Sequence, residues 1–381
     1  MSEKVYISDL ISAYSLRNTE NRSLPVYSVT NSHGFTLSTE YFNKKVFSKD
    51  TSNYKIVPFG AFAYNPSRIN VGSISWQDKE KEVIVSPLYN VFTLKHNVDA
   101  RYLNYFFHSP YCMSYINAYA TGSVRNTLDL KSLGKIPIIL PEEKEQKRVV
   151  KILDCLIKII THRKQALELM NELVKSRFVE MFGDPVRNEK KWIKGNMQSI
   201  CIRITDGEHG SVPRSEIGHP FLNAKHIKPD GTIDWKTTTF VANEVHEKIY
   251  RRCNPETGDI LVTTTGTIGN VVIVPDTEPF SMDRGITLLK LQKEKISSIF
   301  IAWLLKFDSI QEIMNANIHA SAIGHLFLNK VKQLPVIIPP LELQNEFSSF
   351  VIQVDKSRLA IQKSLDETQL LFDSLMQKYF G

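Results

Sequence analysis

One short segment occurs twice in the chain, and this repetition limits the possible folds more than any other feature. The segment LGKIPIILPEEKEQK begins at Leu133, and a related segment, VKQLPVIIPPLELQN, begins at Val331. An offset of 198 residues aligns the two and places Gln146 on Gln344. Similarity at a fixed offset is the signature of a duplicated structural unit. The chain is therefore expected to contain two copies of one fold.

The same offset aligns positions far outside this segment. Phe182-Gly183 coincides with the last two residues of the chain, and agreement extends over about 120 residues. The matched positions include Tyr102 and Phe300, Phe106 and Leu304, Ile116 and Met314, Leu128 and Leu326, and Gly60 and Gly258. This agreement indicates a tandem duplication of one α/β unit.

Each copy has the same predicted order of elements. A variable, strand-rich portion comes first, an amphipathic helix is expected over residues 99–119 and 297–316, and a short buried strand (IPIIL or LPVII) precedes a long helix. Proline at the front of each long helix suits the first helical positions. The predicted fold is α/β (α+β), divided into a first head (residues 1–141), a long helix (142–182), a second head (183–339) and a second long helix (340–381).

Both long helices carry a heptad-like row of apolar side chains. A row of about 40 residues, roughly 60 Å, is longer than one small domain can cover. Arg163 and Arg358 interrupt the rows at different positions, which favours packing of the helices on each other over packing of each helix on its own domain. The expected interface residues are Leu153, Leu156, Ile160, Leu167, Met170 and Val174, with Val351, Val354, Ile361, Leu365, Phe372 and Leu375.

Composition narrows the class of protein only moderately. Hydrophobic residues make up 42% and charged residues 23% of the chain, no apolar run approaches the ~20 residues of a membrane span, and the N-terminus lacks a signal pattern. We therefore expect a cytoplasmic protein. The formal charge of +7 and the pI of about 9.0 favour a polyanionic partner, although weakly.

The sequence shows no recognisable catalytic or metal-binding motif. It contains no phosphate-binding GxxxxGK[ST] loop, no GxGxxG and no GxSxG. The cysteines, Cys112, Cys155, Cys201 and Cys253, have no metal-ligand spacing and are expected to be reduced structural thiols. No catalytic residue, metal ligand or cofactor site is predicted for this chain.

Three polar loops are instead candidates for binding. The first spans residues 64–74, with 263–270 at the matching place in the second copy; the second spans 120–128, with 320–326 opposite; the third spans 204–214 and is followed by 221–231. Their glycines allow close approach, Ser, Thr and Asn can donate to phosphates or base edges, and Arg or Lys can bind guanine. The alternative is that they are ordinary polar turns between strands.

The repetition of these loops at matching places favours a nucleic-acid interface. The residues expected to contact DNA are Asn65, Arg68, Asn70, Ser73, Ser123, Arg125 and Asn126 in the first head, and His209, Lys225, His226, Thr264, Thr265, Thr267, Ser321 and His325 in the second. Two different heads on a fixed spacer can read two different half-sites separated by unread base pairs.

This arrangement resembles the specificity subunits of type I restriction-modification systems. The resemblance rests on the two divergent heads, on the strand-to-helix segment that follows each of them, on TGSVRNTL at Thr121–Leu128 and on FGDP at Phe182–Pro185. It covers essentially the whole chain.

The resemblance implies a role for each part of the molecule. Each head is expected to be a target-recognition domain that reads one half of a bipartite, asymmetric sequence in double-stranded DNA. The long helices are expected to pack as an antiparallel coiled coil in a pseudo-twofold molecule, to set the spacer and to dock two modification subunits. Those partners would carry the S-adenosylmethionine site and methylate adenine N6, and restriction subunits would be further partners.

Two other functions remain open from the sequence. One is a solitary DNA-modifying or nicking enzyme with unrecognised motifs. The other is a coiled-coil scaffold that joins two ligand-binding domains without DNA.

Overall fold

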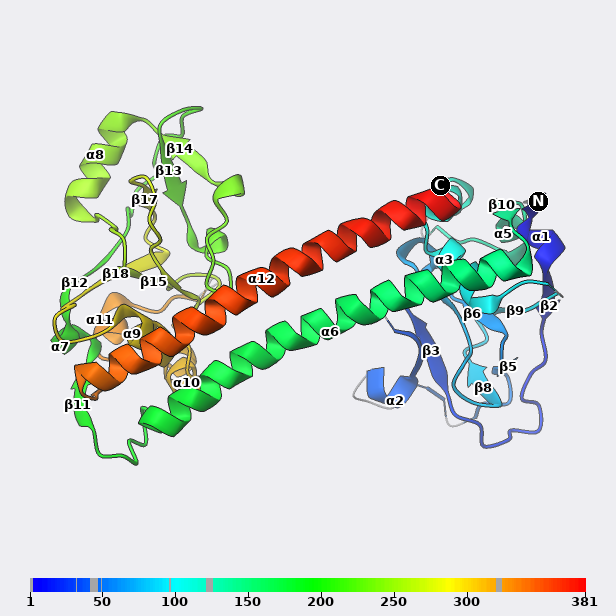
Figure 1. Cartoon of the computed structure of the whole chain (residues 1–381), viewed down its shortest axis with the longest axis horizontal. Helices are drawn as coiled ribbons and strands as arrows, with labels where there is room; N and C mark the ends of the chain where they lie inside the picture. Colours follow the sequence, from blue (N-terminus) through cyan, green and yellow to red (C-terminus); the bar gives the residue numbers. More distant parts are fainter. Residues whose placement is uncertain are drawn as a thin grey trace. The chain divides into compact units, whose positions relative to one another are not determined.

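The chain forms two compact units. The computed structural model describes residues 3–31, 33–41, 47–48, 50–95, 97–120, 126–319 and 324–381 (Figure 1). The first unit contains residues 1–164 and 363–381, and the second contains 165–362. Each unit therefore contains one head and half of each long helix.

The first unit contains the following strands, α-helices and one 3-10 helix. In chain order they are β1 (Glu3–Tyr6), α1 (Ile7–Leu10), β2 (Ile11–Tyr14), β3 (Tyr27–Thr30), β4 (Gly34–Leu37), α2 (Ser38–Tyr41), β5 (Lys55–Pro58), β6 (Phe62–Tyr64), η1 (Ile69–Val71), β7 (Ile74–Trp76), β8 (Glu82–Val85), β9 (Asn90–Leu94), α3 (Ala100–Phe107), α4 (Pro110–Tyr119), α5 (Leu130–Gly134) and β10 (Pro137–Leu140).

The second unit repeats this order with local changes. Its elements are β11 (Ile193–Asn196), α7 (Met197–Ile200), β12 (Cys201–Asp206), β13 (His219–Leu222), η2 (Ala224–His226), η3 (Trp235–Thr237), β14 (Thr239–Val241), α8 (Asn243–Arg252), β15 (Ile260–Thr263), β16 (Val271–Ile273), β17 (Ser281–Met282), β18 (Ile286–Leu291), α9 (Ser298–Leu305), α10 (Asp308–Ala316), α11 (Leu328–Lys332) and β19 (Pro335–Ile338).

The two heads share a four-stranded sheet and an antiparallel strand pair, β1-β10 or β11-β19, and differ in their remaining sheets. The shared sheet is antiparallel, with strand order β2-β9-β6-β7 in the first head and β12-β18-β15-β16 in the second. Beside it, the first head has the antiparallel pairs β3-β4 and β5-β8, whereas the second has the sheet β14-β13-β17 and the helix α8. The duplication predicted from the 198-residue offset is thus visible in topology, and the heads diverge where the sequences do.

The predicted helices at 99–119 and 297–316 are each broken into two. In the first head, Pro110 begins α4 and Ser109 accepts a hydrogen bond from the Cys112 N–H at 3.2 Å, so a new helix starts where the prediction had continuous helix. In the second head, α9 ends at Leu305, and the Gln311 side chain donates to the Leu305 carbonyl at 2.6 Å. The apolar spacing continues across both breaks, which is why periodicity alone missed them.

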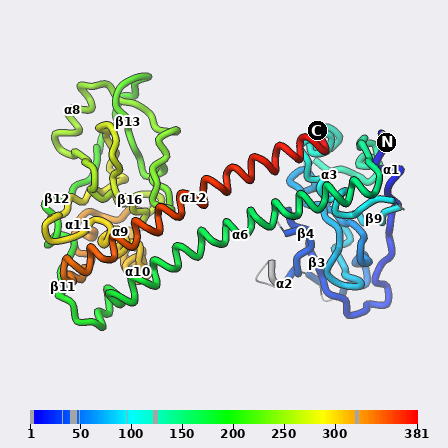
Figure 2. The backbone as a smooth tube through the Cα atoms, viewed as in Figure 1, coloured from blue at the N-terminus to red at the C-terminus, as the bar shows by residue number. Residues whose placement is uncertain are grey.

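The long helices α6 (Glu143–Phe182) and α12 (Leu341–Phe380) have 40 residues each and lie where they were predicted. In the first unit, the last turns of α12 lie beside α3, and the Phe380 and Tyr102 rings are 5.0 Å apart (Figure 2). In the second unit, Phe178 of α6 meets Phe347 of α12 at 5.5 Å. Each unit thus contains a contact between its head and the two helices.

The expected interface residues face inward in their own units. Leu153, Leu156, Ile160 and Leu365 are buried in the first unit, and Val174, Val351 and Val354 are buried in the second. Ile361, Leu167, Met170, Phe372 and Leu375 are half-buried. The Arg163 guanidinium, which interrupts the row in α6, donates to the Ser364 carbonyl at 2.7 Å and to the Thr368 hydroxyl.

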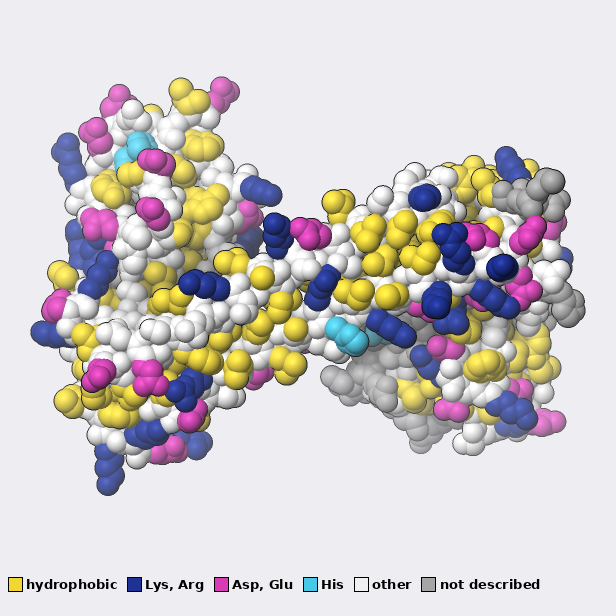
Figure 3. All heavy atoms as spheres, viewed as in Figure 1, with side chains coloured by type: hydrophobic (Ala, Val, Ile, Leu, Met, Phe, Trp, Pro, Cys, Tyr) yellow, Lys and Arg dark blue, Asp and Glu magenta, His cyan; other side chains and the backbone are white. Residues whose placement is uncertain are grey.

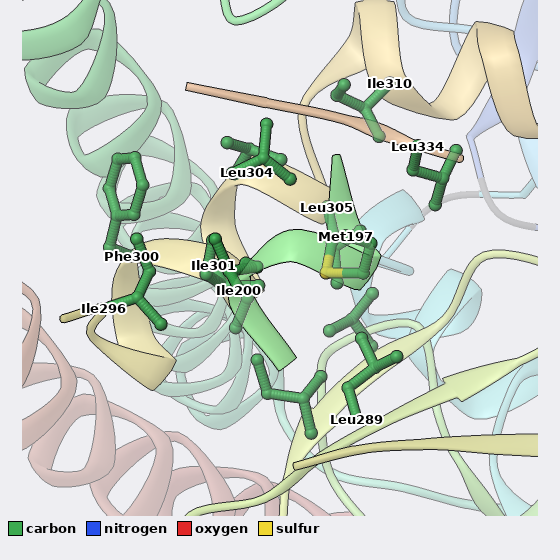
Figure 4. Packing of buried hydrophobic residues seen from close by; sticks show 14 of the residues in the cluster. Met197, Ile200, Leu289, Ile296, Phe300, Ile301, Leu304, Leu305, Ile310 and Leu334 are labelled. Atoms are coloured by element: carbon green, nitrogen blue, oxygen red, sulfur yellow. The ribbon is translucent and has the colours of Figure 1, made fainter. Parts of the chain in front are cut away.

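A buried aliphatic and aromatic cluster forms the centre of each unit. In the second unit α7, β18 and α9 contribute Met197, Leu289 and Phe300, which pack with side chains of α10 and of the segment before β19 (Figure 4). In the first unit Phe62 and Phe92 stack at 5.2 Å between neighbouring strands. These clusters fix the shared sheet against the helices and leave the loops at its edge free for binding.

The repeated segment is explained by one glutamine in each copy. Gln146 accepts from the Asp99 N–H at 2.8 Å and donates to the Pro141 carbonyl at 2.9 Å. Gln344 accepts from the Ser297 N–H at 2.9 Å and donates to the Pro339 carbonyl at 2.7 Å. Both side chains are buried and join the strand-to-helix junction to the start of α3 or α9. The segment is repeated because it makes the same junction twice.

Candidate nucleic-acid interface

The loop between β6 and β7 presents an exposed arginine in the first head. The loop turns through η1, and Gly72, with φ of 86°, ends that turn in a conformation that favours glycine. Arg68 and Asn70 are exposed, and within the described part of the chain the Arg68 guanidinium has no hydrogen-bond or ion-pair partner. Asn65 is half-buried and accepts from the Ser67 N–H at 3.1 Å. The loop therefore has a rigid base and a free cationic tip.

A small pocket of about 120 Å³ lies beside this loop. Its walls come from β3, from the β6–β7 loop and from the residue before β9: Ser28, Val29, Thr30, Asn31, Asn65, Arg68, Val71, Ser73 and Tyr89. Hydroxyl, amide and guanidinium groups therefore converge at one place on the first head.

The second predicted loop meets the first one in both heads. The Leu128 N–H donates to the Pro66 carbonyl at 3.1 Å, and the equivalent Leu326 N–H donates to the Thr264 carbonyl at 2.9 Å. Asn126 is exposed, whereas Ser123, Arg125 and Ser321 lie outside the described residues. Loops separated by some 60 residues in sequence are thus joined by the same hydrogen bond in each copy.

In the second head this junction holds a histidine. The Thr265 hydroxyl and His325 Nδ1 are 2.7 Å apart, and Thr267 is exposed at the tip of the same loop. The pKa of His325 is lowered, first by burial and then by the charge of Arg284. At neutral pH the ring is therefore a neutral hydrogen-bonding group near Arg284.

The third loop joins the same place in the second head. The Glu208 N–H donates to the Met282 carbonyl at 2.9 Å, and the Arg284 N–H donates back to the Glu208 carbonyl at 3.0 Å. His209 is exposed and lies 2.8 Å from the Asp206 carboxylate. Lys225, in η2 of the segment that follows, is also exposed.

Three predicted contact residues lie in the interior instead. The Ser73 hydroxyl donates to the Val29 carbonyl at 2.5 Å, and the Thr264 hydroxyl donates to the Gly285 carbonyl at 3.3 Å. His226 is 1% exposed and is hydrogen-bonded through both ring nitrogens, to the Asn223 N–H and the Thr237 carbonyl. In this conformation these side chains hold loops in place and cannot reach a ligand.

Three arginines that were not predicted lie around the loops of the second head. Arg284 is exposed between β17 and β18; Arg214 lies over the Phe221 ring at 4.0 Å; and Arg252 is 3.5 Å from the Asp206 carboxylate. Arg214 ends the third predicted loop, but Arg284 lies in a short Asp-Arg-Gly turn and Arg252 at the end of α8, and neither segment was among the predicted loops.

Within the described ranges no group of three or more His, Cys, Asp or Glu residues is placed to hold a metal ion. No helix among the same residues is long and apolar enough to cross a bilayer. The four cysteines are free thiols, and burial raises the pKa of Cys201 and of Cys253 to about 12.

Two related heads, each with converging polar loops, are typical of a protein that recognises two separate sites. The family model described as type I restriction modification DNA specificity domain matches residues 8–169 and 215–368. Because these matches cover most of the chain, the chain belongs to that family, and the resemblance inferred from sequence is confirmed. It is a DNA specificity subunit of the type I restriction-modification class.

Curated relatives carry the same description. A type I restriction enzyme MjaIX specificity subunit of Methanocaldococcus jannaschii is 22% identical over 74% of this chain and 69% of its own length. A putative type I restriction enzyme MjaX specificity subunit of the same organism is 23% identical over 81% of this chain and 74% of its own length.

Solved structures share the fold. The crystal structure of the type I restriction-modification S subunit from M. genitalium has a TM-score of 0.59 at 16% identity and covers 100% of this chain and 96% of that one. A chain from a study of complex assembly and conformational transition of the type I restriction-modification system has a TM-score of 0.60 at 15% identity, covering 100% and 97%.

Proposed function

We propose that each head reads one half of a bipartite, asymmetric DNA target. The observation that carries this proposal is the pair of equivalent loop junctions, Leu128 to Pro66 and Leu326 to Thr264, which present different side chains in the two heads. Arg68 and Asn70 are available in the first head, and Thr267, Lys225 and Arg284 in the second. Since these groups differ, the two half-sites are expected to differ in sequence.

The two long helices are proposed to pair as an antiparallel coiled coil and to set the spacer. Support comes from each unit separately. Arg163 binds the backbone of α12 in the first unit, and Arg177 of α6 forms an ion pair with Glu346 of α12 at 2.8 Å in the second. The chain passes between the units only inside α6 and inside α12, so helix length would set the distance between the heads.

Modification subunits are proposed to dock on the outer faces of these helices. Hydrophobic side chains appear along the long helices on the face drawn in Figure 3. Outside the expected interface row, Leu169 is 68% exposed on α6, and Leu359 and Leu370 are each 71% exposed on α12. Large apolar side chains exposed on a helix mark a surface that a partner covers.

The partners are proposed to supply the chemistry. In this scheme two modification subunits bind S-adenosylmethionine and methylate adenine N6, while this chain contributes DNA recognition without a catalytic residue or cofactor of its own. Restriction subunits would join the same complex, which would act on DNA in the cytoplasm.

The test is DNA binding and methylation by the assembled complex. We expect sequencing of methylated DNA from cells that express the subunit with its modification partner to show one two-part motif with a fixed gap. We also expect affinity to fall steeply with salt, because phosphate contacts release counterions. Absence of salt-dependent DNA binding by the complex would favour a scaffold without DNA, and binding of S-adenosylmethionine by the isolated chain would favour a solitary enzyme.

A further inference from the structure

The two heads contain an equivalent four-residue turn that enters the same strand of the shared sheet. In the first head it is Ser86-Pro87-Leu88-Tyr89, which precedes β9, and in the second it is Asp283-Arg284-Gly285-Ile286, whose last residue begins β18. The fourth N–H donates to the first carbonyl in both turns, at 3.0 Å and 3.2 Å. Since β9 and β18 occupy the same place in their sheets, the two turns are structural equivalents.

This turn lies against the candidate interface in each head. In the second head the Thr264 N–H donates to the Gly285 carbonyl at 2.8 Å, which joins the turn to the loop that carries Thr265. In the first head Tyr89 shares the small pocket with Asn65 and Arg68. The turn therefore belongs to the surface proposed to meet DNA, although sequence patterns did not single it out.

The two turns present different side chains from different positions, since Leu88 is the third residue of its turn and Arg284 the second. Leu88 is 75% exposed, so its side chain contributes almost no packing within the first head. Arg284 is also exposed, and its guanidinium has no hydrogen bond or ion pair to any residue that the structure describes. Its backbone is fixed by the hydrogen bond to Glu208, so a free side chain projects from a rigid base.

Charged groups of both signs lie around Arg284. His325 and Asp283 lie close enough for Arg284 to lower the pKa of each, and Arg214 lowers the pKa of Asp283 as well. Burial raises the pKa of Asp283 overall, and its carboxylate accepts a hydrogen bond from the Gly285 N–H at 2.9 Å instead of pairing with the arginine. The guanidinium is left to bind a ligand acceptor.

From this geometry we infer that the turn is a base-reading element in both heads: Arg284 reads guanine in one half-site, and Leu88 contacts a thymine methyl in the other. Guanine offers the O6 and N7 acceptors that match a guanidinium, and thymine offers the only methyl group among the four bases. The inference rests on the proposed function, because it assigns residues within the interface of the two heads.

The experiment compares variants of the full subunit in the assembled methyltransferase. Arg284→Ala is expected to relax one G·C position of one half-site by roughly tenfold or more, and to leave the other half-site unchanged. Arg284→Lys should relax the same position, but the complex should keep most of its affinity for DNA. Lysine retains the positive charge but lacks the bidentate pair of N–H donors that guanine O6 and N7 require. Leu88→Ala is expected to relax one A·T position of the opposite half-site.

Arg251→Ala is the matched control, since Arg251 is an exposed arginine on α8 with no ion-pair partner among the described residues. It should change neither half-site. The inference is overturned if Arg284→Ala leaves the base specificity of both half-sites unchanged. It is also overturned if methylation decreases by the same factor on all sequences, as it would after loss of a phosphate contact. Relaxation of the same half-site by Leu88→Ala and Arg284→Ala would also overturn it.

The wild-type subunit separates this inference from the proposed function. If the wild-type complex yields no two-part methylated motif, the proposed function fails and the variants are not needed. If it yields such a motif and the variants leave it intact, only the assignment of the turn fails.

Discussion

At the scale of single residues, two buried glutamines hold the junctions that the chain repeats. Gln146 and Gln344 each bind a backbone N–H at the start of a short helix and a proline carbonyl before a long one. A buried side-chain amide with several partners is costly to remove, because its partners are left unpaired away from water.

Replacing Gln146 is therefore expected to destabilise the first unit. Gln146→Ala leaves the Asp99 N–H and the Pro141 carbonyl without this partner, at a cost of about 2–4 kcal/mol. Denaturant unfolding, with hydrogen exchange at α3, measures the loss. Gln353→Ala, on an exposed position of α12, is the control and should cost far less. Equal stability of the two variants would show that the junction tolerates the loss.

Arg68 gives the corresponding prediction for binding. Arg68→Ala should weaken DNA binding by the assembled complex without lowering the melting temperature, because its exposed guanidinium makes no hydrogen bond or ion pair with a described residue. Arg22→Ala removes the same charge, but Arg22 is already paired with Glu82 at 2.9 Å, so binding should change little. A large loss of thermal stability in Arg68→Ala would make this residue structural.

Residue type alone could not distinguish side chains that are available to bind DNA from side chains that hydrogen-bond to the backbone and hold the loops in place. Ser73, Thr264 and His226 were chosen because they lie in polar loops, yet their side chains point inward to backbone partners. Arg284 was missed because its short Asp-Arg-Gly turn lies outside the three loops predicted from the sequence. Burial and pairing depend on contacts between distant segments, which a single sequence does not display.

At the scale of elements, the second head differs from the first by α8 and the sheet that supports it. His246 of α8 stacks on His219 of β13 with ring centres 3.8 Å apart, and its Nδ1 lies 2.9 Å from the Ser281 hydroxyl of β17. Tyr250 and Glu247 are its other neighbours. Two stacked imidazoles cannot both be charged at low cost.

This stack predicts acid sensitivity of the second unit. Burial, and then the charge of His219, lower the pKa of His246 below its usual 6.5. The unfolded chain therefore binds a proton more readily, and the stabilisation, complete above pH 6.5, is lost as the pH falls through that value toward the folded pKa. Thermal unfolding at pH 7.5 and 5.5 should show a smaller pH-dependent loss in His246→Asn than in the wild type. Identical losses would contradict this role.

The boundaries of helices were predicted best where the apolar spacing continued over many residues without interruption. The limits of α6 and α12 agree with the sequence within about a residue, since 40 residues of apolar spacing outweigh local effects. The breaks before Pro110 and at residues 306–307 were missed, because packing on the shared sheet continues the apolar pattern through them. The sheet β14-β13-β17 had no counterpart in the first head to guide a prediction.

At the scale of the whole molecule, the chain crosses between its units twice, at 164–165 in α6 and at 362–363 in α12. Both crossings lie inside continuous helices, whose rise is about 1.5 Å per residue. If the paired helices set the spacer, a change of length at these two points leaves every contact within each unit unchanged.

Inserting seven residues after Lys164 and seven after Gln362 should therefore lengthen the gap between half-sites. Seven residues keep the heptad row in register and add about 10.5 Å, close to three base pairs of B-DNA. Sequencing of methylated DNA should show both half-sites unchanged and a gap longer by about three base pairs. The same insertion in α6 alone should reduce methylation, because it shifts the two rows against each other. An unchanged gap in the double insertion would show that the helices do not measure the spacer.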